Sequence, residues 1–160
     1  MSLSRRIAAE VDDLVKSCAP PLCLHAEEGP HRIDVPVSLA TPVGIECQGF
    51  DFTRTDRVEM SLEDLKTWGK SLAARLTYLM EPLSLLEADP VGGEVILRSQ
   101  APTPRNGRRS YYEVHLRKTG LLRFDRIAFD ETTRERRKTP CQFTREVLER
   151  LTDDLVATSV

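Results

Sequence analysis

Residues 111–125 most constrain the fold, because apolar and polar side chains alternate on both sides of a short break. In residues 111–117 every second side chain is apolar, and the same alternation returns in residues 121–125. A three-residue loop with Gly120 in the left-handed conformation would place Leu116 opposite Leu122, with Val114 opposite Phe124. A two-residue turn would instead oppose Leu116 to a charged residue. The pattern therefore predicts an antiparallel hairpin closed by a three-residue loop.

Further strands are predicted on both sides of this hairpin. Short alternating or apolar runs occupy residues 22–25, 33–39, 43–47, 83–85 and 95–97. Pro36 predicts an edge position for its strand, because proline cannot donate to a ladder. Gly49 stands where the apolar phase shifts by one residue, which predicts a bulge.

Three amphipathic stripes predict helices. They cover residues 4–18, residues 61–79 and a C-terminal stretch in which Thr139 is the expected N-cap and Pro140 the first helical residue. Strands that follow one another with short links favour an antiparallel sheet over a parallel α/β fold. We therefore expect a single α+β domain over residues 1–160, with a mainly antiparallel sheet of about seven strands and three amphipathic helices.

Composition narrows the class of protein. Of the 160 residues, 40% are apolar and 30% are charged, which is ordinary for a globular domain. The apolar runs are shorter than a membrane span, and no signal-peptide apolar region follows Arg5 and Arg6. The four cysteines include no CxxC pair. We expect a cytoplasmic protein with reduced thiols and no membrane segment.

No arrangement of reactive side chains predicts catalysis or a cofactor. Cys23, His25, His31 and Cys47 are metal-ligand types, but alternation places Cys23 and His25 on the face opposite Cys47. The candidate thiol nucleophiles are Cys23, with His25 and Asp34, and Cys141, with His115. Neither has a nucleophile elbow or a glycine-rich approach. We expect no catalytic residue, no metal and no cofactor.

Charge is strongly segregated along the chain. Residues 1–97 hold 9 Lys and Arg against 16 Asp and Glu, whereas residues 98–145 hold 13 against 5. In an up-and-down arrangement of the last four predicted strands, the connectors 100–110 and 130–139 lie at the same end. The candidate anion-binding or nucleic-acid-binding residues in these connectors are Arg105, Arg108, Arg109, Arg134, Arg136, Arg137 and Lys138. Tyr111 or Tyr112 beside them would stack a base.

These observations favour a non-enzymatic module that binds a protein partner or forms a homodimer. The order of elements is similar to that of small acidic secretion chaperones, which are dimers, although no residue motif is shared. An RNA- or phosphate-binding protein that uses the basic connectors is the alternative. A thiol enzyme built on Cys141 or Cys23 is the third hypothesis.

Overall fold

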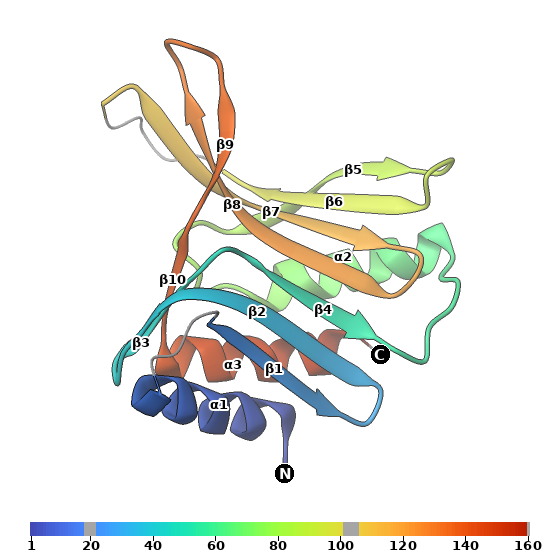
Figure 1. The fold of residues 1–160 in the computed structure, drawn as a ribbon. Coiled ribbons are helices and arrows are strands. Elements are labelled where there is room, and N and C mark those ends of the chain that lie inside the picture. The colour runs from blue at the N-terminus through green and yellow to red at the C-terminus, as the bar shows by residue number, and fades with distance from the viewer. Residues whose placement is uncertain (18–21, 101–105, 160) are drawn as a thin grey trace.

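The computed structural model describes residues 1–17, 22–100 and 106–159 (Figure 1). These residues form three helices and ten strands, so the α+β prediction is confirmed, with ten strands instead of seven. In chain order the elements are α1 (Leu3–Ser17), β1 (Cys23–Glu28), β2 (His31–Ala40), β3 (Gly44–Cys47), β4 (Phe50–Arg54), α2 (Leu62–Arg75), β5 (Leu83–Asp89), β6 (Glu94–Ser99), β7 (Arg108–Arg117), β8 (Leu121–Asp130), β9 (Arg136–Thr139), β10 (Cys141–Thr144) and α3 (Arg145–Thr158).

All three helices lie along one face of the antiparallel sheet, and α3 contacts both α1 and α2 (Figure 1). The core forms between this helical layer and the sheet. Its fully buried members include Ile7 of α1, Leu72 of α2 and Leu155 of α3, together with Phe50 and Phe124 of the sheet. The opposite face of the sheet carries no helix among the described residues, and we call it the charged face.

The sheet forks along β8. Residues 121–124 of this strand pair with β4, whereas residues 126–129 pair with β9. The chain then continues from β9 through Pro140 into β10, which pairs with β3. The resulting strand order is β10-β3-β2-β4-β8-β7-β6-β5, with β1 added beside β2. We call the helices and the sheet that they cover the body. The β4 branch of the fork belongs to the body, whereas the β9 branch extends away from it.

The predicted hairpin is present as β7 and β8. Leu116 is opposite Leu122, Val114 is opposite Phe124, and Gly120 has φ +83°. The register is fixed because this pairing sends Val114, Leu116, Leu122 and Phe124, all buried, towards the helices. The hairpin predicted from residues 83–85 and 95–97 is also present, as β5 and β6.

The edge position predicted from Pro36 is wrong, because β2 lies inside the sheet between β1 and the β3–β4 segment. The backbone N–H of Val37 donates to Leu22 on the β1 side, so the nitrogen of Pro36 faces the other way. On that side the carbonyl of Pro36 accepts a hydrogen bond from the backbone N–H of Gln48 at 2.9 Å, and no acceptor among the described residues requires an N–H from residue 36. Where a bulge was predicted at Gly49, the structure has a break between β3 and β4, at which Gly49 has φ +73°, and the register shift itself lies between Val37 and Leu39 of β2.

The start predicted for the last helix is also wrong. Residues 141–144 form strand β10, and Thr144 is the N-cap, whose hydroxyl accepts a hydrogen bond from the backbone N–H of Val147 at 3.2 Å. The charged connector 130–139 likewise contains strand β9. Helix α2 ends at Arg75, before the predicted Leu79, although Leu79 is still buried. Among the described residues, no helix combines the length and the apolar character needed to cross a membrane.

Candidate interaction surfaces: a basic arm and a charged sheet face

The outer ends of β7, β8 and β9 project beyond the body as one unit, which we call the arm (Figure 1). It consists of residues 106–110 and 128–139. The backbone N–H of Glu131 donates to the carbonyl of Gly107 at 2.8 Å, and Arg108 is paired with Asp130. The two basic connectors therefore meet at one end of the sheet, as expected from the up-and-down path. Arg105 lies outside the described residues.

Most cations of the arm have an acidic partner nearby. Five of the six described candidates lie within 4.0 Å of a carboxylate: Arg108 with Asp130 (4.0 Å), Arg109 with Glu131 (2.5 Å), Arg136 with Glu113 (2.8 Å), Arg137 with Glu135 (3.9 Å) and Lys138 with Asp125 (3.6 Å). Arg134, the sixth, sits in the loop between β8 and β9 with φ +63° and has no such pair among the described residues. The arm itself holds six cations and three acids, a net charge of +3. Exposed pairs of this kind contribute about 0–1 kcal/mol each, so they leave the cations available to a stronger partner.

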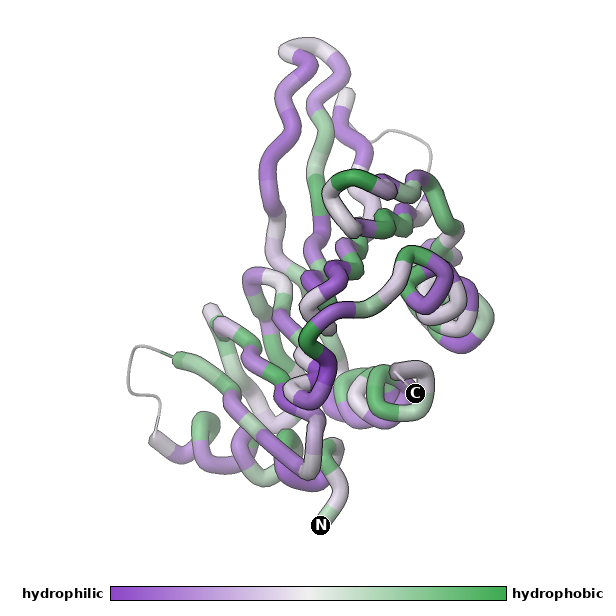
Figure 2. Tube along the Cα trace, turned by 90° about the vertical axis from the view of Figure 1, so that its right-hand side faces the viewer, coloured by the Kyte–Doolittle hydropathy of each residue, from purple (hydrophilic) through white to green (hydrophobic). Residues whose placement is uncertain are grey.

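The arm has no hydrophobic core of its own. None of its described residues is buried, and the last buried pair across β7 and β8 is Tyr111 with Ile127 at its base. Figure 2 shows the arm mostly in the hydrophilic colours. Isolated β-ribbons are only marginally stable in water. The arm is thus held by its continuity with the sheet and by the ion pairs at its base.

A single row of side chains crosses the charged face at right angles to the strands. Consecutive strand pairings place these residues side by side from β1 to β5: His25, Asp34, Asp51, Arg123, His115, Ile96 and Glu87. Arg123 donates to Asp125 at 2.8 Å and to Asp51 at 3.4 Å, and Nδ1 of His25 lies 2.5 Å from Asp34. The row is mostly charged; His25 pairs with Asp34 and Arg123 with Asp51 within it, whereas Asp125 lies outside the row.

Glu113 of β7 is the centre of a second charged cluster. Its Oε2 accepts hydrogen bonds from Nε and Nη2 of Arg98 at 3.2 and 2.9 Å and from Nη2 of Arg136 at 2.8 Å. Its Oε1 lies 2.8 Å from Nε2 of His115, whose Nδ1 contacts Glu94. Burial raises the pKa of Glu113, but the hydrogen bonds from His115 and Arg98 and the charge of Arg136 outweigh burial, so the net pKa is lowered. Glu113 is therefore an ionised carboxylate that fixes two guanidinium groups.

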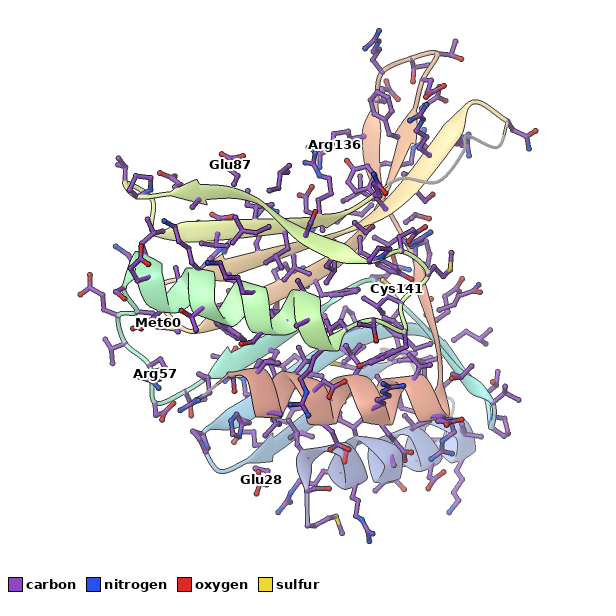
Figure 3. All side chains as sticks on the ribbon, turned by 180° about the vertical axis from the view of Figure 1, so that it is seen from behind. Glu28, Arg57, Met60, Glu87, Arg136 and Cys141 are labelled. Atoms are coloured by element: carbon purple, nitrogen blue, oxygen red, sulfur yellow. The ribbon has the colours of Figure 1, made fainter. Side chains whose placement is uncertain are left out.

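These two guanidinium groups border a pocket on the charged face at the base of the arm. Arg98 and Arg136 lie over the ring of Tyr111, with Cζ atoms 5.1 and 5.9 Å from its centroid. The pocket has a volume of about 340 Å³ and is lined by Arg98, Ser99, Tyr111, Phe129 and Arg136. Figure 3 shows Arg136 where the arm leaves the body. The expectation that Tyr112 would stack a base is wrong, because its ring packs 5.3 Å from Phe124 in the core.

β5, the last strand of the sheet, exposes apolar side chains. Four consecutive residues, 84–87, are exposed, and Leu85 and Leu86 keep 37% and 51% of their surface. A bulge between Leu85 and Glu87 interrupts the pairing with β6. Val91 in the following turn is almost fully exposed. Exposed apolar groups at a sheet edge are unusual unless something covers them.

The described thiols and imidazoles do not form a reactive site. Cys47 and Cys141 are directly opposite each other on β3 and β10, a pairing that the sequence did not predict, and both are free and fully buried. The hydrogen bond with Cys141 and then burial raise the pKa of the Cys47 thiol above its usual value. His115 lies on the charged face, so it does not meet Cys141. His25 does reach Asp34, but the Cys23 thiol donates to the carbonyl of Leu24. Among the described residues, no group of three or more side chains is arranged to hold a metal ion.

Sequence reasoning missed Glu113 and Arg98 as partners of the arm. The predicted hairpin did place Glu113 and His115 on the non-core face. The register of β6 against β7, which sets Arg98 opposite Glu113, is fixed by contacts between separate hairpins. Alternation within one strand carries no information on that register. The only sign of this contact in the sequence was that residues 98 and 113 carry opposite charges.

Comparison with known proteins gives no further guidance, since the chain matches no protein-family model and no curated protein or solved structure is significantly similar to it.

Proposed function

We propose that this protein is a non-enzymatic, cytoplasmic interaction module that associates with a second copy of itself, with the basic arm of each copy docking on the β5 edge of the other. The observation that carries the proposal is the edge itself. Leu85 and Leu86 stay exposed at the end of the sheet beside the acidic residues Glu87 and Asp89. An apolar strip bordered by acids favours a partner that is extended and basic.

The arm meets both requirements. It carries a net charge of +3, whereas the β5–β6 hairpin (residues 83–99) holds three acids and one cation. The bulge at Leu86 makes a continuous intermolecular ladder unfavourable, so the contact is made by side chains. A contact made by side chains does not require the arm to present a strand edge with unpaired backbone groups.

A second copy is a suitable occupant because both halves of the contact are on one chain. The arm points away from β5 of its own chain (Figure 1), so it cannot cover that edge itself. In a two-fold dimer, each arm reaches the other copy's edge, and one contact is made twice. Reciprocal docking therefore satisfies both unpartnered surfaces in a closed assembly.

The cytoplasmic part of the proposal is supported by the thiols. Cys47 and Cys141 lie opposite each other on neighbouring strands without a bond between them. Free thiols in such positions are typical of a reducing compartment.

Charge reversal tests the arm and the edge separately. Glu87→Lys and Arg137→Glu each place like charges at the proposed contact, and each is expected to weaken the dimer about tenfold or more. Light scattering with sedimentation velocity at low micromolar concentration measures this. Lys70→Glu, the same reversal on the exposed side of α2, is the matched control and should dimerise as the unmodified chain does.

Mixing the two variants gives the decisive result. In a mixed dimer both contacts again join opposite charges, so Glu87→Lys and Arg137→Glu together should associate more tightly than either variant does alone. A strictly monomeric unmodified chain would end the proposal. An Arg137→Glu variant that dimerises normally while Glu87→Lys does not would show that β5 docks without the arm.

RNA or phosphate binding by the arm is the second candidate. The convergence of residues 106–110 and 130–139 at one end favours it, and the acidic partners of five of the cations weigh against it. A labelled single strand should shift at low ionic strength, and the shift should disappear in a triple variant with Arg134→Glu, Arg136→Glu and Arg137→Glu. No shift at low ionic strength would rule out this function.

A further inference from the structure

The pocket at the base of the arm is assembled from four strands. Arg98 and Ser99 come from β6, Tyr111 from β7, Phe129 from β8 and Arg136 from β9. Phe129 and Arg136 are directly opposite each other in the β8–β9 pairing. The pocket therefore has two cationic side chains and two aromatic ones, held in register by the sheet.

The two guanidinium groups keep unused hydrogen-bond donors. Each carries five N–H groups. Glu113 accepts two from Arg98 and one from Arg136, and no other acceptor among the described residues takes the rest. Because hydrogen bonds to Glu113 hold both guanidinium groups in place, their remaining N–H donors are oriented before a ligand binds. This arrangement suits an acceptor with two oxygens in a plane.

The charge of the pocket selects a monoanion. Arg98 and Arg136 contribute two positive charges, and the Glu113 carboxylate offsets one of them. A ligand with a single negative charge completes the balance. A dianion such as a phosphate monoester would leave an uncompensated negative charge beside Glu113.

The size and the lining of the pocket indicate what the uncharged part of the ligand is. A volume of about 340 Å³ is at the small end of ligand pockets. Phe129 and Tyr111 provide apolar surface for a flat group, and guanidinium planes also stack on rings. We propose that this pocket binds a planar aromatic monocarboxylate, with the carboxylate bridging Arg98 and Arg136 and the ring against Phe129. Both a free aromatic acid and the C-terminal aromatic residue of a peptide present this chemistry.

Titration of the full chain with simple probes tests the site by NMR. Phenylacetate represents a free acid and N-acetylphenylalanine a peptide terminus; their amides lack the charge. Both acids should shift the Nε–H signals of Arg98 and Arg136 and the ring signals of Phe129. The tighter of the two identifies the source of the carboxylate, and either outcome supports the site. Equal binding of the amides, or tighter binding of phenyl phosphate, would overturn the proposal.

Arginines inside and outside the pocket supply a matched pair of variants. Arg136→Gln removes a pocket donor and should weaken binding about tenfold or more. Arg117→Gln makes the same change at an exposed residue at the other end of β7, outside the pocket lining, and should bind within about twofold of the unmodified chain. Phe129→Ala keeps both guanidinium groups and should also weaken binding. Equal losses in the Arg136 and Arg117 variants, or no shift with any probe, would refute the site.

Discussion

Replacing Phe124 with alanine should cost more stability than replacing any side chain of the arm, because Phe124 joins four strands where the sheet forks. Its ring is fully buried and lies 4.8 Å from that of Phe50 on β4, 5.3 Å from Tyr112 on β7 and 6.1 Å from Phe143 on β10. Phe→Ala changes in a core cost about 3–5 kcal/mol. Each aromatic contact adds about 0.5–1.5 kcal/mol beyond its buried area. We therefore expect a loss at the upper end, about 5 kcal/mol, which rivals the whole stability of many domains.

Urea unfolding followed by far-ultraviolet circular dichroism measures this loss, provided that the slope with denaturant is unchanged. Phe129→Ala is the matched control, since this half-buried ring lies on the charged face and makes no ring contact among the described residues. Its expected cost is at most about 1 kcal/mol. A loss below about 2 kcal/mol for Phe124→Ala, or equal losses for the two variants, would show that the aromatic cluster does not hold the fork together.

Two further predictions concern the backbone and the pH dependence of stability. Gly49→Ala places a Cβ 2.4 Å from the carbonyl oxygen of Phe124, at a residue with φ +73°. Its loss of unfolding free energy in urea should exceed that of Gly29→Ala, where φ is +57° but the space is open and the expected loss is about 1–2 kcal/mol. Equal losses would mean that the backbone at Phe124 moves aside without cost. Burial lowers the pKa of His115, but hydrogen bonds to two carboxylates outweigh it and raise the net pKa above 6.5, so its contribution to stability is complete below that pH and is lost as the pH rises through the folded-state pKa. Burial, followed by the charge of Arg54, lowers the pKa of His31 below 6.5, so stability should also fall as the pH drops beneath that value. Unfolding free energies measured across this range should lose the basic slope in His115→Gln and the acidic slope in His31→Gln, and unchanged slopes would contradict both assignments.

Local sequence rules sufficed for the central hairpin but not for the strand that completes the fork. The register of β7 and β8 follows from alternation and from Gly120, both of which act within a few residues. Residues 141–144 also alternate, yet Thr139 and Pro140 resemble a helix start. What makes this segment a strand is the free edge of β3, about ninety residues earlier in the chain. A partner so distant in sequence leaves no local signal.

The same limit applies to the candidate site. The convergence of the basic connectors could be predicted because it depends only on the up-and-down path of consecutive strands. Their neutralisation could not, because Arg136 and Lys138 pair with Glu113 and Asp125 across strands whose register is set by packing. Counting charges along the chain therefore located the basic surface correctly and overstated its free charge.

The burial of Glu113 and Asp125 explains how an arm without a hydrophobic core keeps a fixed orientation relative to the sheet. Glu113 and Asp125 are nearly buried at the base, so their ion pairs with Arg136 and Lys138 are stronger than those of the exposed tip. Arg134, in the loop at the outer end of the arm, has no carboxylate partner among the described residues, and Arg137, between Arg136 and Lys138 on β9, has one only at 3.9 Å. The ion pairs of Arg136 and Lys138 thus hold the arm, whereas Arg134 and Arg137 keep most of their charge for contact. An acidic partner should therefore engage these two arginines first, which is why Arg137 is the residue whose reversal separates docking of the arm from its folding.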